Sequence, residues 1–118
     1  MRKENSTNTI NQRHLEEVCG MAHTISVMGG RWKLSILGVL ADFGGVRYNE
    51  LRKHIGGISD RMLAKQLKAL EGDGLITKKV EAHVPVKVTY ALSKKGQSLT
   101  PIFQLMTEWG STQLRNCG

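Results

Sequence analysis

GGISDRMLAKQLKALEGDGL, residues 56–75, is the stretch that decides the fold. At 100° per residue, three leucines share one face of a helix and three basic side chains share the opposite face. The leucines are Leu63, Leu67 and Leu70, and the basic residues are Arg61, Lys65 and Lys68. Ser59 stands at the expected N-cap position. The pattern predicts a helix over residues 59–72 that either contacts a polyanion or is a solvated surface helix.

The segment before this basic helix predicts a second short helix. Leu51 and Ile55 share its inward face, whereas Arg52 and Lys53 point outward. Asn49 is placed to cap its N-terminus. A Gly-Gly turn then leads into the basic helix. Two short helices joined by a tight glycine turn, with a basic outer face on the second, are typical of a helix-turn-helix unit.

After the basic helix, the period of the apolar residues changes from that of a helix to that of a strand. The segments LITKKVEA and KVTYALS, residues 75–82 and 87–93, predict two strands of a hairpin, the wing. Pro85 falls at the hairpin tip, where it forfeits no ladder hydrogen bond. Lys79 and Lys87 lie on the wing. The predicted fold class is α+β, mainly α, with a winged helix-turn-helix.

Two helices are predicted ahead of the helix-turn-helix unit. The first covers about residues 21–28, where Met21, Ile25 and Met28 recur at helical spacing. The second, RWKLSILGVLAD at residues 31–42, is apolar nearly all round after its first turn. This second segment is therefore expected to be the central helix of the core.

A last helix is predicted from its cap, Ser93, to about Leu114. Pro101 either kinks this helix or restarts it with Thr100 as a new cap. Its apolar residues form a heptad-like seam, made up of Leu99, Ile102, Met106 and Trp109. We interpret part of this apolar surface as a dimer interface. The alternative is that the helix only closes the core.

Charge is concentrated around the basic helix. The chain has 118 residues and a formal net charge of +7, and its length predicts one domain. Residues 47–95 carry 11 basic and 5 acidic side chains, whereas the rest of the chain carries 6 basic and 5 acidic. Such a distribution indicates a nucleic-acid-binding surface, although a membrane surface or an acidic protein would also fit. Polar residues 1–18 are expected to form a flexible extension ahead of a domain over residues 19–118.

The remaining composition excludes several classes of protein. Apolar runs are too short to span a bilayer and the N-terminus has no apolar signal core, so a cytoplasmic protein without a membrane partner is expected. Cys19 and Cys117 are expected to be free thiols. His14, Cys19 and His23 offer only three metal ligands at a spacing that matches no established zinc pattern. Without a phosphate loop, paired acids or a nucleophile–base motif, neither a cofactor nor catalysis is expected.

Several stretches together resemble the HxlR-type winged helix-turn-helix transcriptional regulators, which are relatives of the MarR group. They are GGRWKLSIL, RYNELRKHIGGIS, RMLAKQLKALEGDGLI, HVPVKVTYALSKKG and the segment 101–110. The resemblance covers roughly residues 19–110, in the family's order. It implies a bacterial, dimeric regulator of double-stranded DNA whose first and last helices form the dimer. The dimer candidates are then Met21, Ile25, Leu99, Ile102, Met106 and Trp109.

The resemblance also assigns roles to the basic residues and to one cysteine. The DNA-binding positions that match are Asn49, Ser59, Arg61, Lys65, Lys68, Lys79 and Lys87. Many members keep a Cys-Pro pair before the first helix, and in some of them this cysteine senses oxidants or electrophiles. Here Cys19 matches the cysteine, but Gly20 replaces the proline. Cys19 is therefore a candidate redox sensor whose local geometry differs from the family pattern.

Together these observations predict a dimeric, sequence-specific transcriptional regulator, expected to be a repressor. It would read a palindromic operator through the helix at 59–72 and the wing at 75–92. A small electrophile or an oxidant acting at Cys19 is the expected effector. A metal-responsive regulator and a winged helix that binds proteins rather than DNA are the alternatives.

Overall fold

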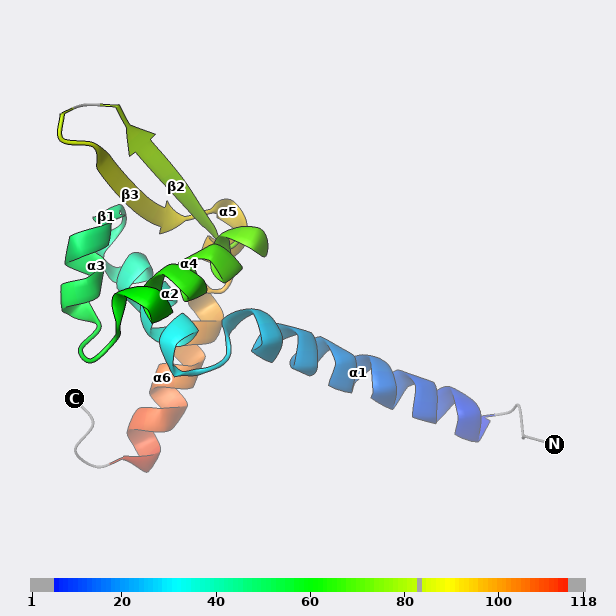
Figure 1. Cartoon of the computed structure of the whole chain (residues 1–118). Helices are drawn as coiled ribbons and strands as arrows, with labels where there is room; N and C mark the ends of the chain where they lie inside the picture. The colour runs from blue at the N-terminus through cyan, green and yellow to red at the C-terminus, as the bar shows by residue number, and fades with distance from the viewer. Residues whose placement is uncertain (1–5, 83, 115–118) are drawn as a thin grey trace.

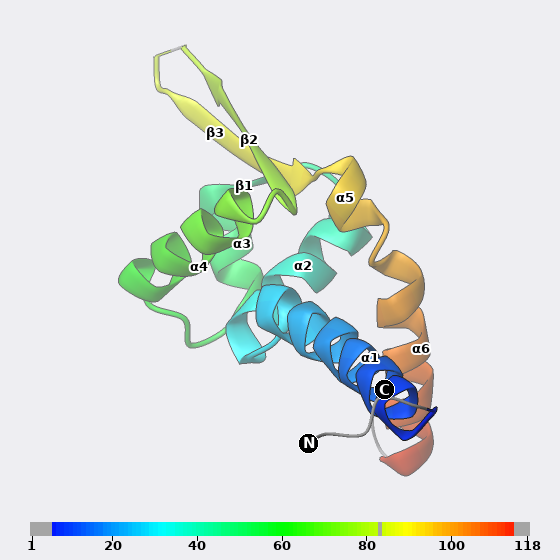
Figure 2. The same cartoon turned by 90° about the vertical axis from the view of Figure 1, so that its right-hand side faces the viewer.

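The computed structural model describes residues 6–82 and 84–114. Its elements are α1 (Ser6–Met28), α2 (Arg31–Phe43), β1 (Val46–Arg47), α3 (Tyr48–His54), α4 (Asp60–Gly72), β2 (Ile76–Glu81), β3 (Lys87–Leu92), α5 (Lys94–Gln97) and α6 (Thr100–Gln113). Figures 1 and 2 show α2, α3 and α4 gathered at the base of the β2–β3 hairpin, whereas α1 extends away from this body. The predicted winged-helix fold, mainly helical with a small sheet, is confirmed.

The core lies where α2 meets α4 and the sheet. Ile36 and Leu37 of α2 are completely buried, and the three leucines of α4 are at most 2% exposed. Around them lie the other buried apolar residues, namely Met28, Leu40, Val46, Leu51, Ile55, Ile58, Leu75, Ile76, Tyr90 and Leu99. The predictions of α2 as the central helix and of the leucine face of α4 are therefore confirmed.

Helix α1 begins at Ser6, far ahead of the predicted start near residue 21. That prediction was wrong because it depended on apolar periodicity, and residues 6–20 are mostly polar. Residues 6–19 contain neither glycine nor proline, so nothing in them interrupts a helix. The division at residue 18 into an extension and a domain stays a prediction.

The wing belongs to a three-stranded antiparallel sheet of order β1-β3-β2. Val46 of β1 pairs with Tyr90 of β3, and both side chains are buried. Ile76 at the start of β2 is also buried and pairs with Leu92 at the end of β3. The short strand β1 therefore anchors the base of the wing to the core, while the hairpin tip extends into solvent.

The C-terminal segment forms two helices rather than one. The Ser93 hydroxyl oxygen caps α5 by accepting a hydrogen bond from the Gly96 amide at 3.0 Å. Gly96 is packed so closely that an added Cβ would meet the backbone carbonyl ahead of β2. Pro101 lies in the first turn of α6, where its missing N–H costs no helical hydrogen bond. The predicted restart is confirmed, but Leu99 rather than Thr100 occupies the cap position because the helix already includes Thr100.

Candidate nucleic-acid interface

Helices α3 and α4 form the helix-turn-helix unit, and the turn between them requires glycine. Gly57 has a φ of 84°, a conformation that residues with a side chain rarely adopt. Ile58, the next residue, is buried and ties the turn to the core. The Ser59 side chain then accepts a hydrogen bond from the Met62 amide at 3.0 Å. This N-cap starts α4 where the sequence predicted it.

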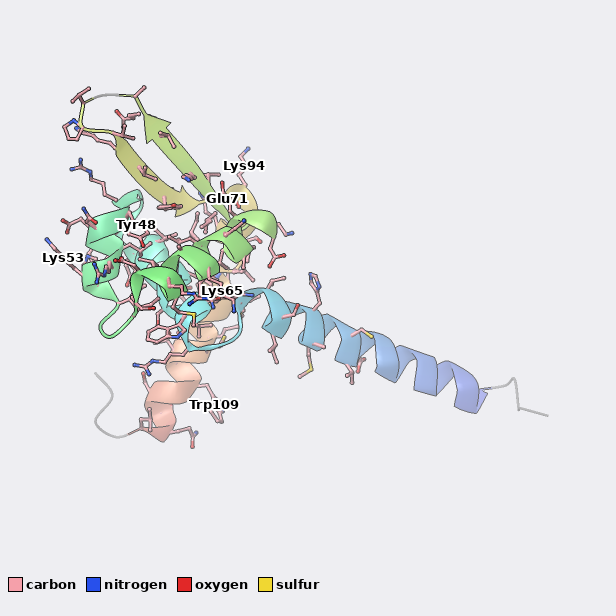
Figure 3. The ribbon with its side chains drawn as sticks, in the orientation of Figure 1. Tyr48, Lys53, Lys65, Glu71, Lys94 and Trp109 are labelled. Carbon is pink, nitrogen blue, oxygen red and sulfur yellow. The ribbon has the colours of Figure 1, made fainter. Side chains whose placement is uncertain are left out.

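Helix α4 carries its cations on the side opposite the core. Arg61, Lys65 and Lys68 are exposed, and Figure 3 labels Lys65 among them. Within the described residues, the ion pairs involve other side chains and leave these three cations unpaired. Unpaired exposed cations are available to phosphates and base edges. The predicted basic face is therefore present as free surface.

The sheet adds a second group of cations. Arg47 of β1 pairs with Thr89 of β3, and Thr89 pairs with Lys79 of β2. Because directly paired residues share a face of the sheet, these three side chains form one row across it. Lys87 lies two residues from Thr89 on the same strand and therefore on the same face. Sequence reasoning missed Arg47, because the pairing that aligns it with the wing joins distant segments.

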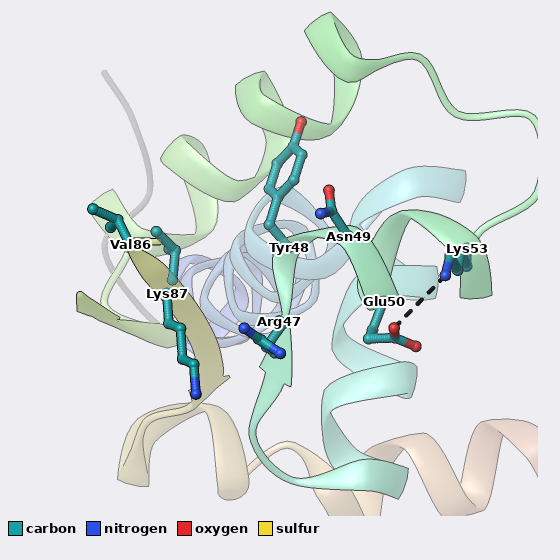
Figure 4. A pocket seen from close by; sticks show the side chains of 8 residues that line it. Arg47, Tyr48, Asn49, Glu50, Lys53, Val86 and Lys87 are labelled. Atoms are coloured by element: carbon teal, nitrogen blue, oxygen red, sulfur yellow. Dashed lines mark ion pairs between the residues drawn. The ribbon is translucent and has the colours of Figure 1, made fainter. Parts of the chain in front are cut away.

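A hollow of about 320 Å³ lies between β3 and the start of α3 (Figure 4). Its lining residues are Arg47, Tyr48, Asn49, Glu50, Lys53, Val86, Lys87 and Val88. The ammonium of Lys53 pairs with the carboxylate of Glu50 at 3.8 Å. Arg47 and Lys87 are the cations of this hollow without an ion-pair partner among the described residues. The hollow is thus suited to an anionic group.

Asn49 lies in the first turn of α3 rather than at its cap. The helix starts at Tyr48, and the preceding residue is Arg47, whose backbone is extended. The capping prediction was wrong because β1 leads directly into the helix, so the chain leaves the extended conformation two residues earlier than expected. Asn49 is nevertheless exposed and lines the hollow, close to the wing.

Exposed apolar side chains gather on α1 and α6. Helix α6 has no buried residue, and Figure 3 labels its Trp109, which is 70% exposed. The other exposed apolar residues of the two helices are Val18, Met21, Ile25, Ile102, Leu105 and Met106. Leu99 differs from the rest of the predicted seam, because it precedes α6 and belongs to the core. Large apolar groups that face water in this way mark an interaction surface.

The exposed surfaces of α1 and α6 meet at a second hollow, of about 580 Å³. It lies beside the turn between α1 and α2 and is lined by Ile25, Met28, Gly29, Gly30, Arg31, Leu34, Ser35 and Met106. Ile25 of α1 and Met106 of α6 both belong to the predicted dimer residues. The structure therefore brings these two residues, far apart in sequence, to one place.

Cys19 is exposed on α1 as a free thiol. The helix continues through Gly20, beside which there is open space. The described residues contain no group of three His, Cys, Asp or Glu side chains that could hold a metal ion. The side chain of His14 and the whole of Cys117 lie outside the described part of the chain. In that part, no helix has the length and apolar content needed to cross a lipid bilayer.

The sequence model of the HxlR-like helix-turn-helix family matches residues 27–117. The chain belongs to this family. The uncharacterized HTH-type transcriptional regulator YdzF of Bacillus subtilis is 43% identical over 91 residues, which cover 77% of this chain and 84% of YdzF. The chain is therefore a helix-turn-helix transcriptional regulator, a class of DNA-binding proteins rather than of enzymes.

Similar solved structures agree with the fold. The redox regulator HypR in its reduced form is 39% identical, with a TM-score of 0.77 over 82% of this chain and 94% of HypR. The reduced form of YodB from B. subtilis is 36% identical, with a TM-score of 0.72 over 84% of this chain and 96% of YodB. The HxlR-type family and the winged-helix fold predicted from the sequence are thus confirmed.

Proposed function

We propose that this HxlR-like regulator is a cytoplasmic homodimer that represses transcription by reading a palindromic operator through α4 and the wing. The observation that carries the proposal is the exposed, unpaired basic face of α4, the second helix of the helix-turn-helix unit. In such units the second helix enters the major groove, and a two-fold dimer places two of them about 34–36 Å apart. The row of cations on the sheet supports contacts of the wing with the DNA backbone.

The basic residues divide into those that contact base edges and those that contact phosphates. Arg61 lies in the first turn of α4, where side chains reach base edges, and its guanidinium can bind guanine O6 and N7 with two hydrogen bonds. Lys65, one turn further along, can contact either a base or a phosphate. Lys68, Lys79 and Lys87 neutralise phosphates. Ser59 and Asn49 lie at the starts of α4 and α3, where we expect them to contact the DNA backbone as well.

Selection of bound DNA from a random pool tests the proposal as a whole. We expect an enriched sequence with two-fold symmetry and half-sites separated by one helical turn. Enrichment of a single unpaired half-site would contradict the dimer. Failure to retain any DNA would favour the alternative of a winged helix that binds proteins.

Arg61→Ala is expected to weaken binding to the selected sequence by about 1–3 kcal/mol and to relax base preference, because a bidentate contact is lost. Lys79→Ala is expected to weaken binding to all sequences alike and to lower the salt slope, log K against log[salt], by about 1. Titrations of labelled selected and random duplexes at several salt concentrations measure both effects. Equal losses on both duplexes for both variants would contradict this division of roles.

The dimer is supported by the apolar surface shared by α1 and α6. Two exposed residues of this surface, Ile25 of α1 and Met106 of α6, line the hollow beside the α1–α2 turn. In a lone protomer, the described part of α1 buries little of its surface, and an unsupported helix in water is of marginal stability. Burial against a second copy would cover both helices and set the spacing of the two α4 helices.

The proposed effector is an oxidant or a small electrophile acting at Cys19. Two observations support it: the thiol is exposed on α1, two residues before the proposed dimer residue Met21, and the similar protein HypR is described as a redox regulator. Modification there would change the packing of α1 in the dimer and hence the spacing of the α4 helices. A metal-responsive regulator finds no comparable support among the described residues.

Cys19→Ser is expected to bind the operator as wild type does and to lose the response to an oxidant. The serine keeps the size of the side chain but cannot form a sulfenic acid or a disulfide. Mobility-shift titrations before and after diamide treatment measure this difference. An identical loss of binding in both proteins after treatment would eliminate Cys19 as the sensor, and Cys117→Ser provides the matched control.

A further inference from the structure

A cluster of three side chains joins α3 to the first turn of α4. The Nε of Arg52 lies 3.3 Å from Oδ1 of Asp60. The hydroxyl of Tyr48 donates toward the same Oδ1 at 3.2 Å and toward the Asp60 backbone carbonyl at 3.3 Å. Figure 4 shows the Tyr48 ring extending from the start of α3 toward α4. The cluster therefore connects the two helices of the unit at the point where α4 begins.

The Arg52–Asp60 pair orients a side chain more than it stabilises the fold. The two side chains are 51% and 61% exposed, and ion pairs in such solvent contact contribute little to folding. Because Nε is the atom that meets the carboxylate, both Nη groups of Arg52 remain available as donors. An arginine held in this way presents a fixed, planar edge that can bind a phosphate with two hydrogen bonds.

The Tyr48 hydroxyl donates to the Asp60 carboxylate, which in turn pairs with Arg52. Burial, together with the nearby charge of Asp60, raises the pKa of the Tyr48 hydroxyl, so this group stays protonated and acts as a donor. Lys53, the neighbour of Arg52, differs in this respect. Its ammonium pairs with Glu50 of the same helix and so makes no link to α4.

We propose that Arg52 is a further contact to a DNA phosphate and that Asp60 is the positioning residue that orients it. The proposal rests on the proposed function, since it concerns the same interface. In helix-turn-helix units the first helix crosses the DNA backbone, which places an outward arginine of α3 near a phosphate. Asp60 thus improves DNA binding although it is itself negatively charged.

The competing account is that Asp60 only repels DNA. In that case Asp60→Asn removes a negative charge from the interface and tightens binding to any duplex. If Asp60 positions Arg52, the same substitution weakens DNA binding instead, because the amide no longer holds the Arg52 guanidinium by an ion pair. The sign of the change in affinity on Asp60→Asn therefore separates the two accounts.

The experiment compares variants on a random duplex and on the selected sequence at several salt concentrations. Arg52→Ala is expected to weaken binding to both about tenfold and to lower the salt slope by about 1. Asp60→Asn is expected to weaken both about threefold, and Tyr48→Phe to weaken them less, since each removes only part of the orientation. Lys94→Ala, which removes an exposed cation of α5, is the control and is expected to keep the wild-type salt slope.

A double variant shows whether Asp60 acts through Arg52. In an Arg52→Ala background, Asp60→Asn is expected to tighten binding, because only the repulsion of phosphates is left for it to relieve. Glu71→Gln, at the far end of α4, provides the control for removing one negative charge from that helix. Circular dichroism and thermal melting establish that each variant is folded.

Two results overturn the inference while leaving the proposed function intact. One is tighter binding by Asp60→Asn in the wild-type background, and the other is wild-type affinity and salt slope in Arg52→Ala. If the wild-type protein binds neither duplex, the proposed function and this inference fail together.

Discussion

Leu67→Ala is expected to lower the free energy of unfolding by about 2–5 kcal/mol. Leu67 is 2% exposed, in the core where α4 packs against α2 and β2. Truncation removes buried methyl groups and leaves a cavity that close-packed neighbours fill only in part. Because a small domain is stable by only about 5–15 kcal/mol, the loss is a large fraction of the total. Urea denaturation followed by circular dichroism measures it.

The matched control is Lys68→Ala, at the next position of the same helix. Lys68 is exposed, so its truncation is expected to change stability by less than about 0.5 kcal/mol. Equal destabilisation by both variants would contradict the assignment of the two faces of α4. The two variants also separate folding from binding, because Lys68→Ala is expected to weaken DNA binding without weakening the fold.

The double variant Met106→Glu with Trp109→Glu is expected to convert the dimer to a monomer and to weaken operator binding about 100-fold or more. Both side chains are exposed in the protomer, at 42% and 70%, so the charges disturb the proposed interface rather than the core. Burying two carboxylates in an apolar interface carries a large desolvation cost. A monomer loses the effective concentration that links two half-sites, which is typically worth a factor of 10²–10⁴.

Sedimentation equilibrium measures the first effect, and titration of the full palindrome against a single half-site measures the second. Gln104→Glu is the control, because it adds a carboxylate to the same helix on the side that faces α2. That variant is expected to remain dimeric. A double variant that stays dimeric, or a wild-type protein that is monomeric while it binds the palindrome, would contradict the assignment of α6 to the interface.

Much of the interface could be predicted from sequence because its signals are local. The 3.6-residue spacing of the leucines in α4 and the two-residue spacing of Val88, Tyr90 and Leu92 in β3 depend only on neighbouring positions. Both sets of side chains pack in the core or against it, as predicted. The Ser59 cap was also predicted, because its hydrogen bond closes within three residues. Helix α1 shows the limit of this approach, because its residues 6–20 are mostly polar and offer no apolar period to detect.

The contacts between distant segments could not be predicted. Arg47 joins the row of Lys79 only through the pairing of β1 with β3, across some forty residues of chain. The cluster at Asp60 depends on the angle between α3 and α4, because this angle decides that Arg52 rather than Lys53 meets the carboxylate. Leu99 looked like a member of the outward seam until the break between α5 and α6 placed it in the core.

By itself, the sequence of residues 56–75 determined a basic helix, its cap and its buried face, because periodicity and capping are properties of a few adjacent residues. The whole sequence also determined the family, since several such stretches occur together in one order. Only the tertiary structure decided which cations share a surface, which are held by carboxylates and which apolar side chains remain in water. Those outcomes depend on strand register and helix packing, which no single stretch of sequence contains.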